Sequence, residues 1–237
     1  MYKKFHAKAQ SLKAKKERNQ SFFFASYCLF FAPLRETGYL NCMDYTFLTN
    51  IALGIGLSAC AGFRVFIPML AGAIAAHFGI IDLPKDMQWM SSWPAIIVFG
   101  TAAIAEIGAY YIPFIDNILD TIAAPLSVAA GTVLATSILP VHDLEAPMRW
   151  GIGLLAGGAA AGTIQLGTGL LRLLSSKATV GAGNAVVATG ENAAAIGGSV
   201  LVFVVPVVIA LALLFLIGWI LYKIIGRIAS RMSGVSH

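Results

Sequence analysis

Two residues of opposite charge, Arg64 and Glu106, each lie deep inside a long apolar stretch of the sequence. A charge near the centre of a bilayer costs about 2.5–3.5 kcal/mol even on insertion scales, so each residue needs a partner or a water-filled cavity. We expect both side chains to face the interior of a helical bundle, close to each other or to a shared polar cavity. One interpretation is a structural ion pair that holds a broken helix together. The other is that Arg64 binds an anionic headgroup, carboxylate or phosphate, with Glu106 as counter-charge or proton carrier.

A second group of polar residues follows Pro113. Asp116 and Asp120 are four residues apart, next to Asn117, so on a helix the two carboxylates share one face. Two such carboxylates repel each other unless they are solvated, protonated or bound to a cation. One interpretation is that Asp116 caps a helix N-terminus near the membrane interface. Asp120, one turn deeper, is the better candidate for an ion or proton site.

A third polar group, rich in glycine, spans residues 181–192. Nucleotide binding is not supported, because the stretch lacks a Gly-Lys-Ser/Thr ending. The simpler prediction is a solvated loop with a helix cap at Asn192. The alternative is a loop that folds back into the membrane and brings Asn184 and Glu191 toward the charges named above.

Metal and disulfide chemistry find little support. A short loop holds three polar residues that could suggest a metal site: His142, Asp143 and Glu145. Side chains in such loops are more often solvated. The three cysteines do not have metal-type spacing: Cys28, Cys42 and Cys60. We assign no metal ligand, no structural disulfide and no cofactor.

The composition is that of a membrane protein. Hydrophobic residues make up 58% of the 237 residues and charged residues 11%, with a mean hydropathy of +0.81. Soluble domains carry about 25% charged residues. The net charge of +5 comes from residues 1–42, which hold eight Lys/Arg against two Glu, while residues 43–237 hold eight against nine acidic residues. Nucleic-acid binding therefore loses its main support.

We divide the chain into a basic N-terminal extension, residues 1–42, and a single helical transmembrane domain, residues 43–237. The apolar run 22–34 is too short to cross a bilayer comfortably, since a spanning helix needs about 20 residues. We favour Met43 as the natural start, with the preceding residues not native or disordered. An interfacial anchor and a cleaved signal peptide are the alternatives.

The hydropathy pattern predicts an all-α, polytopic protein with about five membrane segments. Their approximate ranges are 45–78, 93–112, 116–139, 150–174 and 193–222. The first is interrupted by Gly62, Arg64 and Pro68, which predicts a broken or re-entrant helix. Pro206 should kink the last. Small residues recur every four positions, as in Gly54, Ser58 and Gly62, and this spacing predicts close helix packing.

Basic residues decide the expected orientation. Lys223, Arg227 and Arg231 follow the last segment, so we predict a cytoplasmic C-terminus. The same count places a loop containing Arg172 and Lys177 on the outer side, which is against the positive-inside rule.

Several motifs together resemble the bacterial family called domain of unknown function 4126. They are Gly56-Leu57-Ser58-Ala59, Ala61-Gly62-Phe63-Arg64-Val65-Phe66-Ile67-Pro68, Glu106 with Ala109-Tyr110-Tyr111-Ile112-Pro113, and Asp116-Asn117 with Leu119-Asp120-Thr121, Ala123 and Pro125. Gly183-Asn184 and Glu191 are similar to positions near that family's C-terminal end, although Ala185 stands where the family has proline. The resemblance implies a multi-pass protein of the bacterial inner (cytoplasmic) membrane and supplies no activity.

Interior charges of both signs, a broken helix and abundant glycine favour a small transporter, flippase or scramblase for an anionic or lipidic solute. Its expected partners are the lipid bilayer and an anionic small molecule or lipid headgroup, and a homo-oligomer stays open. The alternative is a non-transporting scaffold or assembly partner. We do not expect an enzyme, because only Asp116 and Asp120 approach a catalytic constellation.

Overall fold

The computed structural model describes residues 42–141, 143–179, 183–204 and 215–223. The described part of the chain is helical and contains no strand, which confirms the predicted all-α class. Its elements are α3 (Cys42–Cys60), α4 (Phe66–His77), the 3-10 helix η1 (Lys85–Ser91), α5 (Trp93–Ala109), α6 (Pro113–Ile138), α7 (Ala146–Gly153), the π-helical turn η2 (Leu154–Gly158), α8 (Ala159–Thr179) and α9 (Asn184–Val204). Residues 215–223 are helical as well.

Three helical stretches are long and apolar enough to cross a membrane. They are Thr121–Ile138 within α6, Ala146–Lys177 through α7 and α8, and Asn184–Val204 in α9. A fourth arises if η1 and α5, which meet at an angle of 59°, form one span. The described residues thus provide three to four candidate spans, and the expected count of about five is not confirmed. Pro206 and its predicted kink lie outside the described residues.

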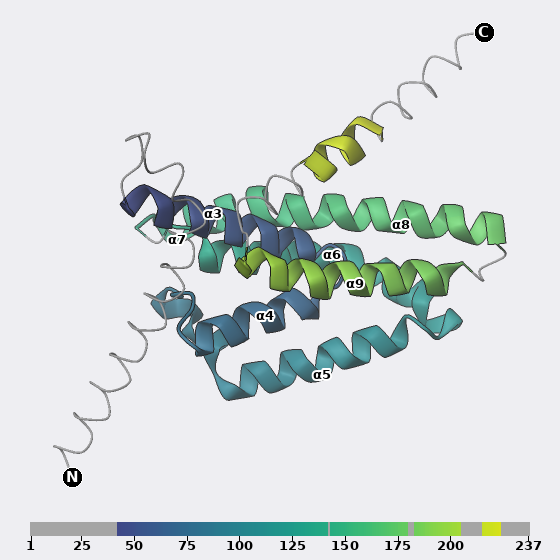
Figure 1. Cartoon of the computed structure of the whole chain (residues 1–237), viewed down its shortest axis with the longest axis horizontal. Coiled ribbons are helices and arrows are strands. Elements are labelled where there is room, and N and C mark those ends of the chain that lie inside the picture. Colours follow the sequence, from purple (N-terminus) through teal and green to yellow (C-terminus); the bar gives the residue numbers. More distant parts are fainter. Residues whose placement is uncertain (1–41, 142, 180–182, 205–214, 224–237) are drawn as a thin grey trace, which may run out of the picture.

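The predicted interruption of the first segment is present, between Cys60 and Phe66. Figure 1 shows that α3 runs into the bundle and α4 returns toward the end from which α3 came. Two contacts agree with this path: Gly56 of α3 lies against Val202 near the end of α9, and the His77 ring at the end of α4 packs 4.8 Å from Trp93 at the start of α5. We call α3, α4 and the residues between them the hairpin, and Ala61–Val65 its tip.

Glycine allows the tip to pack against its neighbours. A Cβ added to Gly62 would overlap the Ala161 carbonyl oxygen and the Ile164 side chain of α8. One turn earlier, the buried Ser58 hydroxyl donates to the Gly131 carbonyl of α6 at 2.8 Å. The small residues predicted from their four-residue spacing therefore serve close helix packing.

α6 and the π-helical turn also approach each other closely. A Cβ on Gly131 would lie 2.5 Å from the Gly157 carbonyl oxygen, so the two backbones touch at this point. Such contact replaces the hydrophobic driving force that two helices lack inside a bilayer. α6 and the π-helical turn are thereby tightly packed, and the hairpin contacts α6 through Ser58 and α8 through Gly62.

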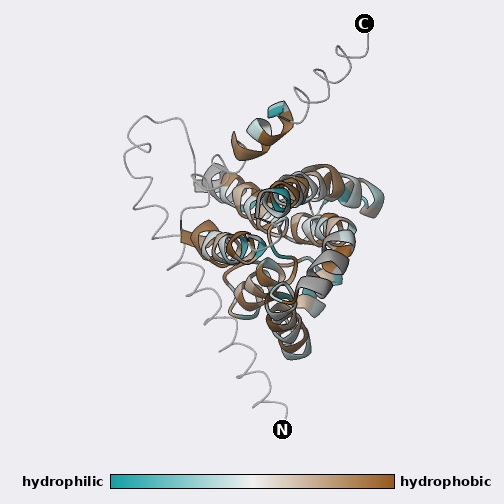
Figure 2. Cartoon of the chain, turned by 90° about the vertical axis from the view of Figure 1, so that its right-hand side faces the viewer, coloured by the Kyte–Doolittle hydropathy of each residue, from teal (hydrophilic) through white to brown (hydrophobic). Residues whose placement is uncertain are grey.

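Large apolar side chains cover the perimeter of the bundle. Ile104, Leu155 and Val186 are 74%, 77% and 74% exposed, as lipid-facing residues would be. Figure 2, which looks along the helices, shows apolar residues on outward-facing parts of several of them. Long apolar helices with such an exterior are consistent with a membrane protein.

Candidate functional site at the tip of the hairpin

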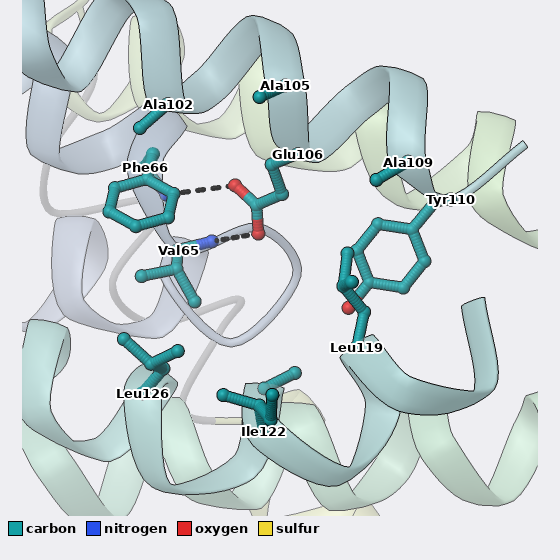
Figure 3. Close-up of a pocket in the computed structure, with 11 residues that line it drawn as sticks. Val65, Phe66, Ala102, Ala105, Glu106, Ala109, Tyr110, Leu119, Ile122 and Leu126 are labelled. Atoms are coloured by element: carbon teal, nitrogen blue, oxygen red, sulfur yellow. Dashed lines mark hydrogen bonds between the residues drawn. The ribbon is translucent and has the colours of Figure 1, made fainter. Parts of the chain in front are cut away.

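The start of α4 is capped by a side chain from another helix. Val65, at the N-cap position, has no side-chain oxygen to cap the helix with. Glu106 of α5 takes this role, because its two carboxylate oxygens accept hydrogen bonds from the Val65 and Phe66 amides at 2.8 and 3.0 Å (Figure 3). A negative charge here also meets the positive end of the α4 dipole. Glu106 is 9% exposed, so its predicted inward orientation is confirmed.

Arg64, next to this cap, is buried and bound on several sides. Its Nε donates to Asn192 Oδ1 at 2.5 Å, and its Nη2 donates to the Ala188 carbonyl at 3.2 Å. Its Nη1 lies 3.2 Å from Glu191 Oε2 as an ion pair, yet among the described residues this buried nitrogen has no hydrogen-bond acceptor. The guanidinium carbon lies 3.7 Å from the centre of the Tyr110 ring.

The structural ion pair between Arg64 and Glu106, one of our two interpretations, is replaced by two separate arrangements. Arg64 pairs with Glu191, and Glu106 binds the backbone amides of the two residues that follow Arg64. The reason is that the return of α4 creates a helix N-terminus at the tip, and its free amides attract the Glu106 carboxylate.

A second arginine, Arg172 of α8, reaches the same place. Its Nε donates to Glu191 Oε1 at 3.0 Å, and its Nη2 pairs with Glu191 Oε2. Its guanidinium carbon lies 4.1 Å from the centre of the Tyr110 ring. We placed Arg172 in an outer loop, which is wrong: α8 continues to Thr179, and Arg172 is 4% exposed. An arginine between two pairs of leucines could have suggested a buried position.

The site thus brings together two guanidinium groups, one aromatic ring and two carboxylates from the tip, α5, α8 and α9. We call these residues the ion cluster: Arg64, Glu106, Tyr110, Arg172 and Glu191. Both arginines share Glu191, while Glu106 is engaged by backbone amides. Planar guanidinium groups suit carboxylate and phosphate oxygens, so the arrangement can bind an oxyanion. Within the described ranges no group of three His, Cys, Asp or Glu residues could hold a metal ion.

The site lies inside the bundle. Glu191 is seven residues after the start of α9, and Arg172 is seven residues before the end of α8. At about 1.5 Å per residue, this places the cluster about 10 Å from those helix ends. The charges therefore need the internal partners that they have.

The prediction for the glycine-rich stretch is partly wrong. We expected a solvated loop with a cap at Asn192, but α9 already begins at Asn184 and Asn192 lies inside it. The alternative, a loop that folds back into the membrane, is wrong for these residues as well, but its expectation that Glu191 lies near Arg64 is confirmed. Asn184 instead accepts a hydrogen bond from the Ser176 hydroxyl at 3.0 Å.

The Asp116 group cannot be assigned to the site. The helix that contains it begins at Pro113 with Ile112 at the N-cap, so Asp116 is not the capping residue. The side chains of Asp116, Asn117 and Asp120 lie outside the described residues.

A cavity of about 350 Å³ lies beside the cluster, between α5 and α6 (Figure 3). Its lining is apolar apart from Glu106 and the Tyr110 hydroxyl: Val65, Phe66, Ala102, Ala105, Glu106, Ala109, Tyr110, Leu119, Ile122, Ala123 and Leu126. Tyr110 therefore borders the cavity, and its ring also makes cation–π contacts with the two guanidinium groups.

Several candidate spans, a helical hairpin and a buried ion cluster define a class, that of helical proteins with the features of integral membrane proteins. Residues 51–225 match the family described as Domain of unknown function (DUF4126). This match covers well over half of the chain and every residue of the cluster, so the protein belongs to that family, and the resemblance is confirmed. Neither the curated proteins nor the solved structures give a match.

Proposed function

We propose that this protein transports an anionic solute or an anionic lipid across a bacterial inner membrane, and that Arg64 and Arg172 bind the anion. The observation that carries the proposal is the convergence of two buried guanidinium groups on one carboxylate, Glu191. Arg64 Nη1 lies 3.2 Å from Glu191 Oε2 without making a hydrogen bond to it. An oxyanion that replaces Glu191 would accept that hydrogen bond.

In this proposal Glu191 holds the two arginines in the absence of substrate, and the substrate anion replaces it. Transporters commonly place such sites at broken helices inside the membrane, where irregular backbone borders a cavity. Glu106 keeps the tip folded throughout, because it caps α4. Four further polar residues stay candidates for the pathway: Asp116, Asn117, Asp120 and Asn184. The proposed transport breaks no covalent bond.

The test is flux through reconstituted vesicles, with inorganic phosphate and fluorescent phosphatidylglycerol as two separate probes. Arg64→Lys and Arg172→Lys keep the charge but lose the planar fork. Arg149→Lys is the matched control, since Arg149 is also buried but pairs with Asp86, to which its Nη2 donates. We expect loss of flux in the first two variants and normal flux in the control.

Two outcomes would reject transport. One is flux no higher than that of empty vesicles with both probes. The other is normal flux in Arg64→Lys and Arg172→Lys variants that elute as folded protein in size-exclusion chromatography.

A second candidate function is a non-transporting scaffold or assembly partner. The observation that favours it is that Glu106 and Glu191 use all four carboxylate oxygens on partners within the chain. The cluster would then only stabilise the fold. Co-purification of a stoichiometric partner, with loss of folded protein on neutralising either glutamate, would distinguish this function from transport.

The proposed orientation places the C-terminus in the cytoplasm. Lys223, Arg227 and Arg231 support it, because basic residues that follow a span favour the cytoplasmic side. Accessibility of an engineered C-terminal cysteine to an impermeant reagent in intact cells tests it.

A further inference from the structure

The cavity between α5 and α6 has the shape of a short groove along the two helices. Each helix contributes positions spaced three and four residues apart, from Ala102 to Ala109 on α5 and from Leu119 to Leu126 on α6. Seven residues of helix span about 10 Å. The groove therefore runs parallel to the helices, as the hydrocarbon chains of a bilayer would.

The groove is open on its outer side and closed at the back. Ile122 and Leu126 on its rim are 48% and 38% exposed, whereas Val65, Tyr110 and Ala123 are 4%, 5% and 6% exposed. The rim belongs to the same apolar perimeter as Ile104 of α5. Bilayer hydrocarbon thus has direct access to the groove.

Water is a poor occupant of this space. A buried water needs two to four polar partners, and apolar cavities stay dry. The carboxylate of Glu106 already accepts two backbone hydrogen bonds at the edge of the groove (Figure 3). The volume is large enough for an apolar ligand. It is about 350 Å³, more than twice the volume of an apolar cavity of about 150 Å³ that binds benzene.

Charge complementarity identifies the kind of lipid. Tyr110 lies at one end of the groove, and the guanidinium groups of Arg64 and Arg172 lie against its ring at 3.7 and 4.1 Å. That end is also the one nearer to the connection between α5 and α6, where a headgroup would be. A lipid with one chain in the groove would have its headgroup near these two guanidinium groups, where it would replace the Glu191 carboxylate that they share.

We propose that the groove between α5 and α6 binds one acyl chain of an anionic membrane lipid whose headgroup is recognised by Arg64 and Arg172. This inference rests on the proposed function and names its substrate class, a lipid rather than a free anion. Tyr110 separates the chain from the charges in the described state. Movement of its ring would join the two parts of the site.

The test uses the full chain in phosphatidylcholine vesicles that contain phosphatidylglycerol with a photoactivatable group in one acyl chain. We expect cross-links on peptides that contain Leu119, Ile122 and Leu126. Labelling should be several-fold stronger than with photoactivatable phosphatidylcholine. Ala105→Phe, which adds a ring at the exposed rim, should reduce labelling several-fold, whereas Ile104→Phe, one residue away and outside the groove, should not.

Three outcomes would overturn the inference: equal labelling by the two lipids, labelling spread evenly over the perimeter, or unchanged labelling in Ala105→Phe. If Ala105→Phe does not fold, Ile122→Trp blocks the rim from the other helix and replaces it. Cross-linking does not require flux, so specific labelling without flux rejects transport and keeps the lipid site. Flux of phosphate without labelling of the groove does the reverse.

Discussion

Among the described residues, Glu106 is the one side chain that accepts hydrogen bonds from the first amides of α4, and replacing it by alanine removes this cap. The Val65 and Phe66 N–H groups, now bonded at 2.8 and 3.0 Å, would lose their acceptor. Both amides belong to buried or half-buried residues, and water cannot easily replace the carboxylate inside the bundle. The hairpin tip should therefore loosen before the rest of the fold.

The size of the effect follows from the number of amides left without an acceptor. Each costs about 1–3 kcal/mol, so Glu106→Ala should lower the free energy of unfolding by about 2–6 kcal/mol. Glu106→Gln keeps one acceptor oxygen but turns an NH2 group toward the other amide, so its cost should be about 1–3 kcal/mol. If Glu106 served instead as the ion partner of Arg64, both variants would leave a buried charge unpaired and would cost the same, about 3–5 kcal/mol.

Denaturant titration in bicelles measures the order of stability, and hydrogen exchange of the Val65 and Phe66 amides locates the effect. Glu145→Ala is the control, because Glu145 is exposed and its side chain makes no cap for α7. The capping role is refuted if Glu106→Gln and Glu106→Ala are equally destabilised, or if neither variant speeds exchange of these two amides.

Three further predictions concern packing and the ion cluster. Gly131→Ala should lower the free energy of unfolding by about 1–3 kcal/mol, because its methyl group meets the backbone of the π-helical turn, whereas Gly151→Ala, with open space around it, should be neutral in the same titration. Glu191→Leu should be less stable than Arg172→Met, since the first leaves two buried guanidinium groups without their shared carboxylate and the second leaves Glu191 one arginine; equal stability would contradict the shared pairing. Tyr110→Leu should cost about 1–4 kcal/mol from two cation–π contacts of about 0.5–2 kcal/mol each, and a double-mutant cycle with Arg172→Met should show coupling between the two positions.

The sequence predicted the broken first segment because the signals are local. Gly62, Arg64 and Pro68 interrupt an apolar run within seven residues, and the helices end and begin around them. The burial of Arg64 and Glu106 was predictable for a similar reason, since the cost of a charge in lipid depends on its depth in the segment.

The partners of these charges could not be predicted, because they depend on tertiary structure. The cost of burial requires some partner for Arg64 but does not say which carboxylate supplies it. Glu106 meets amides rather than a guanidinium group only because α4 turns back and exposes its N-terminus inside the bundle. The interruption of the first segment predicted a broken or re-entrant helix, but it did not indicate which side chain would cap the returning helix.

The start of α9 was misjudged for a different reason. Glycines at 181, 183 and 190 suggested a loop, since glycine destabilises helices in water by about 1 kcal/mol relative to alanine. Glycine is more frequent in transmembrane helices, and Gly190 has open space around it inside α9. Shifting the helix start to Asn184 places Glu191 and Asn192 within reach of Arg64.

The most direct test of the anion site is a structure of the protein in a lipid nanodisc that contains phosphatidylglycerol. We expect a phosphate group in contact with the guanidinium groups of Arg64 and Arg172, with Glu191 moved away from at least one of them. Arginines found on the lipid-facing perimeter would contradict it, as would an unchanged cluster with the phosphate bound elsewhere.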